Sequence, residues 1–462
     1  MNKLFVVIMM ISGMIGCEST TDIKPGPGNS DDSGSGGDGD GDGDSDGGGG
    51  GDGDSDGDTD VDSGTSPAPD YSYLWVANTA EGTVSKIATR ETKEVARYET
   101  CSYGNCDPSR TSVNIYGDMV VTGRRQLGYD GVPWTLEGNS MVTKISAYES
   151  GCDDRNNNGK IETSSGPSNV LPYGDDECVL WSTDLEGNIG ARGTAWDGVG
   201  DPATGKGGHI WVGTCDRTTI ESHETATVYV INGDTGNIED KITVDSYCLY
   251  GAASDGESVW FIDILYPTKS GSNPSSDHYR LTRIDIETHK VSYFKTNCAY
   301  GLTIDANKRI WTSGYSADYM SDCVARFNPA TNELVSNVIT EQKPFSWGNW
   351  LRGLSVGIGQ SAGYVWIAQT NGTLHKIDMN TLEKTAAFDI ESSLFVDGAQ
   401  KSHLIGTAID FDGYIWAISQ VGDTAYKINP SDGSYEKVKI GDGPYTYSDM
   451  TGIQLQNAIL VE

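Results

Sequence analysis

Residues 154–162, DRNNNGKIE, have the oxygen-bearing residues of an EF-hand-type calcium loop at its first nine positions. Calcium prefers six to eight oxygen ligands, and Gly159 stands where such a loop turns sharply. Ser165 replaces the usual glutamate at position twelve, so a carboxylate from residues 175–177 would have to substitute. The spacing predicts a structural calcium ion that orders the 148–177 insertion; the alternative is an asparagine-rich turn. The candidate ligands, with the lysine acting through its carbonyl, are Asp154, Asn156, Asn158, Lys160 and Glu162.

Arginine and tyrosine recur just before segments that are expected to form inner strands of a repeat. Guanidinium groups that converge on one point would attract an anion, and would bind a carboxylate or phosphate bidentately. In the alternative, the arginines pair with carboxylates in a central channel and simply fill it. The residues at this position are Arg110, Arg192, Tyr250, Tyr300, Arg352, Ile405 and Thr451.

Aromatic residues are frequent in the segments expected to form loops on the same face. Large rings with a polar group suit the binding of sugars, peptides or flat ligands. In the alternative, these rings pack the loops against one another. Trp347 and Trp350 join the arginines and tyrosines above as ligand-binding candidates. The complete aromatic set is Tyr129, Trp134, Tyr266, Tyr315, Tyr319, Phe345, Trp347, Trp350, Tyr445 and Tyr447.

A repeat with three or four strands per unit must position these residues. Each unit has a Gly/Thr-containing segment, a strand that usually carries Trp, and a strand resembling Lys/Arg-Ile-Asp, as in 301–305, 309–311 and 324–327. A period of about 40 to 60 residues with this content is typical of a β-propeller. Seven sets of strands predict an all-β, seven-bladed propeller over residues 71–462.

The chain is expected to close the ring with its two ends. It begins at a second strand, Leu74–Asn78, and the last inner strand is predicted at Gly452–Leu455. Three strands from one end and one from the other would then share a blade, which hides sheet edges that would otherwise be exposed.

Eight of the nine cysteines are expected to form four disulfides, because an even number in an exported protein indicates a disulfide framework. The propeller limits partners to neighbours, most of them in loops of the top face. Crosslinked loops would lose less entropy on binding a ligand. The neighbouring pairs are Cys101 with Cys106, Cys152 with Cys178, Cys215 with Cys248, and Cys298 with Cys323.

The blade motifs resemble the virginiamycin B (streptogramin) lyase-like propeller family over residues 71–462. The motifs are WVANTAEGTVSKI at the start, YGLTID and RGLSV as inner strands, and RIW and YIW as second strands. The resemblance implies a histidine general base, carboxylates and a magnesium ion that together open a lactone by elimination. Fold motifs alone do not establish activity.

The catalytic set of that family is not reproduced. His403 precedes an inner strand, but Lys401 stands where the family has a glutamate. Glu221 and His223 have the right spacing but fall between a second and a third strand. These three residues, His403, His223 and Glu221, are the weak catalytic candidates. Magnesium is expected only if the chain is a lyase.

Residues 1–17 have the features of a bacterial lipoprotein signal. Lys3 precedes the apolar run Leu4–Ile15, which is too short to span a membrane. The ending MIGC resembles a lipobox, which implies that Cys17 is lipidated and becomes the mature N-terminus; an ordinary cleaved signal is the alternative. Glu18, rather than Asp, follows it and favours the outer membrane.

Residues 18–70 are rich in Gly, Asp and Ser and cannot bury apolar area, so we expect a disordered tether. The alternative role is calcium binding by its DxDxDG spacing. The formal net charge of the chain is −34. Nucleic acid is therefore an unlikely partner, because binding phosphates requires a basic surface.

Together these features predict a monomeric, lipid-anchored protein of the cell envelope, on the periplasmic side or the cell surface. Its propeller would bind a small molecule, a glycan or a protein through the top face, without catalysis. One alternative is a streptogramin-lyase-like carbon–oxygen lyase or lactone-opening enzyme. Another is a structural module of an envelope assembly that binds through the outer edges of its blades.

Overall fold

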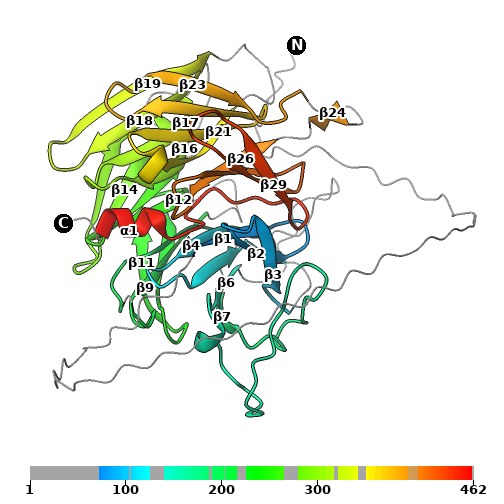
Figure 1. Ribbon diagram of the computed structural model, residues 1–462. Helices are drawn as coiled ribbons and strands as arrows, with labels where there is room; N and C mark the ends of the chain where they lie inside the picture. Colours follow the sequence, from blue (N-terminus) through cyan, green and yellow to red (C-terminus); the bar gives the residue numbers. More distant parts are fainter. Residues whose placement is uncertain are drawn as a thin grey trace, which may run out of the picture. The chain divides into compact units, whose positions relative to one another are not determined.

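The computed structural model describes residues 72–102, 106–124, 140–186, 190–201, 203–215, 225–264, 279–316, 321–341, 350–393, 395–396, 399–400 and 403–459. In this part of the chain, antiparallel strands form seven sheets arranged in a ring, and a small hairpin forms an eighth (Figure 1). The predicted seven-bladed propeller is confirmed. None of the described helices is long and apolar enough to cross a membrane. Cys17 and the predicted tether 18–70 lie outside the described residues.

Each four-stranded blade is a meander whose first strand faces the axis. The second blade comprises β4 (Pro108–Val113), β5 (Met119–Gly123), β6 (Ser140–Ile145) and β7 (Val179–Leu185). The third comprises β8 (Ala191–Trp196), β9 (His209–Thr214), β10 (Ala226–Asn232) and β11 (Ile238–Val244). The fourth comprises β12 (Cys248–Ser254), β13 (Ser258–Ile264), β14 (Tyr279–Asp285) and β15 (Val291–Lys295). The fifth blade comprises β16 (Cys298–Ile304), β17 (Ile310–Ser316), β18 (Ser321–Asn328) and β19 (Glu333–Glu341). The sixth comprises β20 (Leu351–Val356), β21 (Tyr364–Gln369), β22 (Thr373–Asp378) and β23 (Lys384–Asp389). The seventh comprises β26 (Leu404–Ile409), β27 (Ile415–Ser419), β28 (Thr424–Ile428) and β29 (Tyr435–Lys439). The remaining short elements are η1 (Glu149–Gly151), η2 (Gly359–Ser361) and the hairpin of β24 (Phe395–Val396) with β25 (Ala399–Gln400).

The first blade joins the two ends of the chain. Its strands are β1 (Tyr73–Asn78), β2 (Thr83–Ala88) and β3 (Lys93–Glu99). The inner side of β1 is covered by residues 444–450, which we call the closing segment. The amide of Tyr445 donates to the carbonyl of Ala77, and the amide of Trp75 donates to the carbonyl of Met450. Closure by the two ends is confirmed, but the strand predicted at Gly452–Leu455 is wrong. Most of those residues belong to the helix α1 (Ile453–Ile459), which follows the closing segment.

Tryptophan anchors the second strand of six blades. These side chains are at most 1% exposed, because each is buried between neighbouring blades. In three blades the indole Nε1 donates to an aspartate Oδ2 at the end of the inner strand, at 2.8–2.9 Å, and we call these pairs the Asp–Trp clasps. They are Asp255 with Trp260, Asp305 with Trp311, and Asp410 with Trp416. The clasps fix the bottom of the blade.

The cation in the third strand of the repeat links one blade to the next. The side-chain nitrogen donates to a carbonyl in the turn after the third strand of the following blade. The link from the seventh blade to the first, Lys427 Nζ to Thr89 O at 2.8 Å, closes the circle. The other links are Lys86 to Ala147, Lys144 to Gly233, Arg326 to Met379 and Lys376 to Pro430. The repeated Lys/Arg is therefore structural.

Glycine in the inner strands lets backbones approach at the axis. A Cβ atom on Gly406 would lie 2.0 Å from the carbonyl oxygen of Thr446, and one on Gly353 would lie 2.6 Å from the Cβ of Tyr447. Any side chain at these two positions would push the closing segment off the ring. The glycine of the repeat therefore allows the closing segment to fit.

Candidate functional site

Most of the predicted mouth residues meet at one end of the channel. The guanidinium carbon of Arg110 lies 5.0 Å from the ring centre of Tyr250, and that of Arg192 lies 5.4 Å from the same ring. The guanidinium of Arg352 lies 4.5 Å from the Tyr300 ring, which is itself 5.4 Å from Tyr250. All five side chains are at most 5% exposed. These five residues therefore converge as the repeat predicted, but their side chains are buried.

The closing segment completes this group, which we call the Arg–Tyr cluster: Arg110, Arg124, Arg192, Arg352, Tyr250, Tyr300, Tyr445 and Tyr447. The ring of Tyr447 stacks on Arg110 with 3.3 Å between guanidinium carbon and ring centre, and lies 4.6 Å from the ring of Tyr300. Arg124, at the end of β5, lies 5.2 Å from the Tyr445 ring and pairs with Asp107. Tyr445 and Tyr447 were expected only as loop aromatics, and Arg124 was not predicted.

Thr451, predicted at the mouth, lies at the opposite end of the channel. Its hydroxyl donates to the carbonyl of Ile409, the last residue of β26. The prediction failed because it placed the inner strand at Gly452. The closing segment runs eight residues earlier, so Tyr445 and Tyr447 take the place assigned to Thr451. Ile405 is buried and packs in the same apolar core as Tyr250 and Tyr447.

Arg110 is the most enclosed cation of the cluster. Its side chain has no exposed surface, and burial lowers the pKa of its guanidinium. Nη1 donates to the carbonyl of Ser109 at 2.9 Å, while Nε and Nη2 have no hydrogen-bond partner among the described residues. Donors of this kind, held over a tyrosine face, suit an anionic acceptor.

Three tyrosine hydroxyls form a chain within the cluster. The hydroxyl oxygen of Tyr445 lies 3.0 Å from that of Tyr250 and 2.7 Å from that of Tyr300. Burial by itself raises the pKa of Tyr250, but the positive charges of Arg192 and Arg110 outweigh it, and the pKa lies below the ordinary tyrosine value. Burial and the neighbouring Tyr250 raise the pKa of Tyr445. The chain therefore sits in a positive electrostatic potential.

Trp350 and His403 flank the cluster. The Trp350 ring centre is 5.2 Å from the guanidinium of Arg352. Burial and, secondarily, the charge of Arg352 lower the pKa of His403 to about 4, so its imidazole is neutral at physiological pH. Its Nε2 has no hydrogen-bond partner within the described part of the chain.

Several predicted site residues lie outside the described residues. They are Glu221, His223 and Trp347, together with Tyr129, Trp134, Tyr266, Tyr319 and Phe345.

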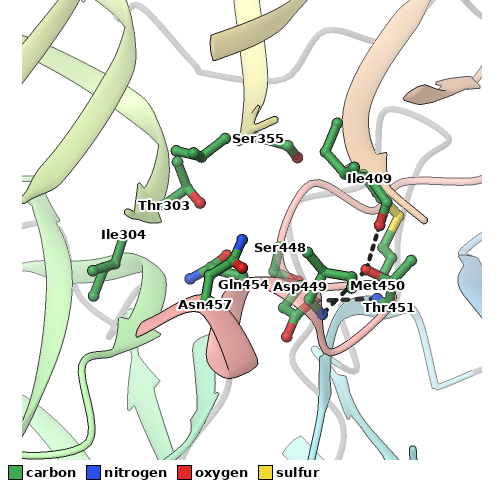
Figure 2. Close-up of a pocket in the computed structure, with 13 residues that line it drawn as sticks. Thr303, Ile304, Ser355, Ile409, Ser448, Asp449, Met450, Thr451, Gln454 and Asn457 are labelled. Carbon is green, nitrogen blue, oxygen red and sulfur yellow. Dashed lines mark hydrogen bonds between the residues drawn. The ribbon is translucent and has the colours of Figure 1, made fainter. Parts of the chain in front are cut away.

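A small pocket lies at the bottom of the channel (Figure 2). It lies between α1, the closing segment and the ends of β16, β20 and β26, and its volume is about 20 Å³. This is room for a water molecule rather than for an organic ligand. Burial raises the pKa of Asp449 in its wall to about 6, although this carboxylate accepts hydrogen bonds from the amides of Gly452 and Thr451. The pocket is therefore not a candidate ligand site.

The loop in which calcium was predicted is a hydrogen-bonded turn. Oδ1 of Asp154 accepts the amide of Asn158 at 3.1 Å, and Oδ2 accepts that of Gly159 at 2.8 Å. The side-chain oxygen of Asn158 accepts the amide of Lys160, and its amide nitrogen donates to Glu162 at 2.9 Å. These contacts bring the predicted oxygen ligands to one side of an exposed turn.

Glu177 holds the same loop from inside. Its carboxylate accepts the amides of Arg155 at 2.8 Å and Glu162 at 3.0 Å. No group of three His, Cys, Asp or Glu residues with the arrangement of a metal site occurs in the described ranges. Any calcium ligand set here therefore depends on asparagine and main-chain oxygens.

All four expected disulfides are present, each joining the predicted neighbours. Cys215–Cys248 connects the end of β9 to the start of β12 in the next blade. Cys298–Cys323 joins the inner and third strands of one blade. Cys152–Cys178 closes the insertion that contains the predicted calcium loop.

Comparison with known proteins supports the fold only. No protein-family description matches the sequence, and no curated protein is significantly similar to it. Similar solved structures include hydrazine synthase from Kuenenia stuttgartiensis (TM-score 0.47, 11% identity, 73% of this chain and 88% of that chain). A streptogramin B lyase (TM-score 0.36, 16%, 54% and 69%) and apo AztD from Citrobacter koseri (0.44, 12%, 81% and 96%) also match. A streptogramin B lyase is thus among the solved structures to which this chain is similar, and none of these matches assigns an activity to the chain.

Proposed function

We propose that this chain is a cell-envelope lipoprotein whose propeller binds a ligand with an anionic group at the mouth of the channel, without catalysis. The observation that supports it is Arg110, a buried cation in a cluster of further arginines, two of whose donors have no partner among the residues that the structure describes. The partly exposed Tyr445 and Trp350 give the ligand apolar contact beside the charged group. Binding energy comes from charge-assisted hydrogen bonds in a site of low dielectric constant.

The test is a thermal-shift screen of organic acids against their neutral amides. Acids should raise the melting temperature and the amides should not. Replacing Arg352 by Gln should abolish the shift, whereas Arg90→Gln, an exposed arginine paired with Asp412, should leave it unchanged. Equal shifts with acids and amides would reject an anion site.

A lactone-opening lyase is the second candidate, and His403 is the observation that favours it. A neutral imidazole beside the cluster, whose Nε2 has no hydrogen-bond partner in the described ranges, has the form of a general base. Magnesium-dependent opening of a lactone by the wild type, lost in His403→Ala, would establish the enzyme and reject the non-catalytic proposal. The same assay with His223→Ala covers the other predicted base.

A structural calcium ion in the 154–162 loop forms part of the proposal. Hydrogen bonds within the turn join Asp154 to Asn158 and Asn158 to Glu162, and hard oxygen donors suit calcium. Saturating calcium at about 100 times its Kd should stabilise the protein by about 2.7 kcal/mol. Chelator should reverse this, and Asp154→Ala should abolish it, while Asp201→Ala in another exposed turn should retain it. A melting temperature that changes with neither calcium nor chelator would exclude the ion.

The membrane anchor has an independent test. We propose lipidation of Cys17 and outer-membrane attachment, with the 18–70 segment as spacer. The wild-type protein should incorporate labelled fatty acid and sediment with membranes, and Cys17→Ser should do neither. Crosslinking in cells, mapped to residues on β15, β19 or β29, would instead favour a structural role in an envelope assembly.

A further inference from the structure

The charge of Arg110 requires compensation inside the channel. Removing a guanidinium from water costs several kcal/mol unless an opposite charge or hydrogen-bond acceptors replace the lost hydration. The described residues give this side chain one carbonyl acceptor, from Ser109, and tyrosine faces. Within the described part of the chain, no carboxylate is hydrogen-bonded to Arg110, and the carboxylate of Asp107 pairs with Arg124 instead. A negative charge near Arg110 must therefore come from elsewhere.

The tyrosine chain is placed to provide that charge. The Arg110 guanidinium carbon lies 5.0 Å from the ring centre of Tyr250 and 5.4 Å from that of Tyr445. A phenolate on either of these residues would accept a hydrogen bond from the other, because their oxygens are 3.0 Å apart. Hydrogen bonds to an ionised acceptor are about twice as strong as neutral ones.

We propose that the hydroxyl chain Tyr250–Tyr445–Tyr300 releases one proton to solvent and carries a tyrosinate beside Arg110, which a bound oxyanion replaces. Binding of a carboxylate or phosphate group then returns one proton to the tyrosinate, so one proton is taken up for each anion bound. This inference rests on the proposed anion site and adds the class of its ligand and its pH dependence.

The arginines around the chain favour the ionised phenol, and Arg124, which follows β5 and lies 5.2 Å from the Tyr445 ring, is itself paired with the Asp107 carboxylate. Tyr250 on β12 faces Arg110 from β4 and Arg192 from β8, and Arg352 from β20 contributes a smaller effect. The closing segment adds only the neutral Tyr445 and Tyr447. Positive charge favours the ionised phenol, which is why the pKa of Tyr250 is low despite burial. Above that pKa the tyrosinate repels an incoming anion, so affinity falls as the pH rises.

The first experiment is an ultraviolet titration of the intact protein, since tyrosinate absorbs near 295 nm. One of the 23 tyrosines should ionise well below the ordinary value of about 10. The step should disappear in the double variant that carries both Tyr250→Phe and Tyr445→Phe. It should move to higher pH in Arg110→Gln. Tyr435→Phe, on the outer strand β29, is the control that should keep it. A titration without an early step, or a step that survives the double replacement, would overturn the tyrosinate.

The second experiment repeats the titration with sodium acetate at constant ionic strength. Acetate should shift the step to higher pH, and its affinity should fall about tenfold per pH unit above the midpoint. A step that neither acetate nor inorganic phosphate moves would reject exchange with an anion, and with it the proposed binding function, while the tyrosinate would stand. Acid-specific stabilisation without any step would reject the tyrosinate alone.

Discussion

The two ends of the channel treat buried polar groups in opposite ways. At the bottom, each Asp–Trp clasp satisfies an indole with a carboxylate of the same blade, and that carboxylate also holds the adjacent turn, as Asp410 does for Tyr414. At the mouth, arginines from different blades meet tyrosines, and Arg110 keeps two donors without partners among the described residues. The three clasps are therefore complete within their own blades, whereas Arg110 at the mouth keeps donors open to a further acceptor.

This difference follows from how the repeat is built. A clasp joins residues five or six positions apart, so every copy of the repeat can form it alone. The Arg–Tyr cluster needs side chains from several blades and from the closing segment. Groups that depend on so many elements and leave buried donors open are expected at functional sites rather than at structural ones.

The largest predicted effect is at the bottom. Asp410→Ala removes the acceptor of the Trp416 indole and of two turn amides, and should lower the free energy of unfolding by about 3 kcal/mol. Urea denaturation measures it. Asp432→Ala, in an exposed turn with Ser434, is the control and should cost much less. Equal losses would show that the clasp contributes no more than an ordinary turn.

The mouth should respond differently. Arg110→Met keeps most of the volume and removes a buried charge, so the free energy of unfolding should change by less than about 1 kcal/mol or rise. The same urea series measures it. A loss as large as that of Asp410→Ala would mean that Arg110 stabilises the fold as strongly as a clasp does, and the contrast between the two ends would fail.

A smaller effect distinguishes clasped from unclasped tryptophans. Trp416→Phe removes the indole donor of the Asp410 carboxylate, whereas Trp211 Nε1 has no partner in the described residues. Trp416→Phe should therefore cost about 1 kcal/mol more than Trp211→Phe. Melting curves of the two variants give the difference. Identical costs would assign the role of these residues to packing alone.

The smallest effect is in the third blade, where His209 replaces Trp211 as the partner of Asp197. The hydrogen bond to Asp197 at 2.8 Å, with help from Glu239, raises the pKa of His209 against a desolvation effect. Its stabilisation should be complete below about pH 6.5 and disappear as the pH rises through the higher folded-state value. His209 is one-third exposed, so we expect less than about 1 kcal/mol.

Stability of the wild type and of His209→Gln at two pH values measures this contribution. The difference between the two proteins should be larger in acid than in base. A difference that grows with pH would reverse the sign and contradict the ion pair with Asp197.

Local sequence patterns predicted much of the site but not its completion. Arg110, Arg192 and Tyr250 were found because the repeat marks the residue before each inner strand. Tyr447 was expected only in a loop, because its register depends on where the closing segment pairs with β1. One signal in the sequence could have located the closing segment. Tyr445 and Tyr447 alternate along the chain shortly after the last outer strand, as residues on one face of a strand do.

The sequence alone determined the blade count, the neighbouring disulfides and five of the eight residues of the Arg–Tyr cluster, because each depends on a short local pattern. Tertiary structure decided that residues 444–450 close the ring and that α1 follows them. It also placed Tyr447 against Arg110. These outcomes depend on contacts between the two ends of the chain, such as Ala77 with Thr446, 369 positions apart, which no local pattern encodes.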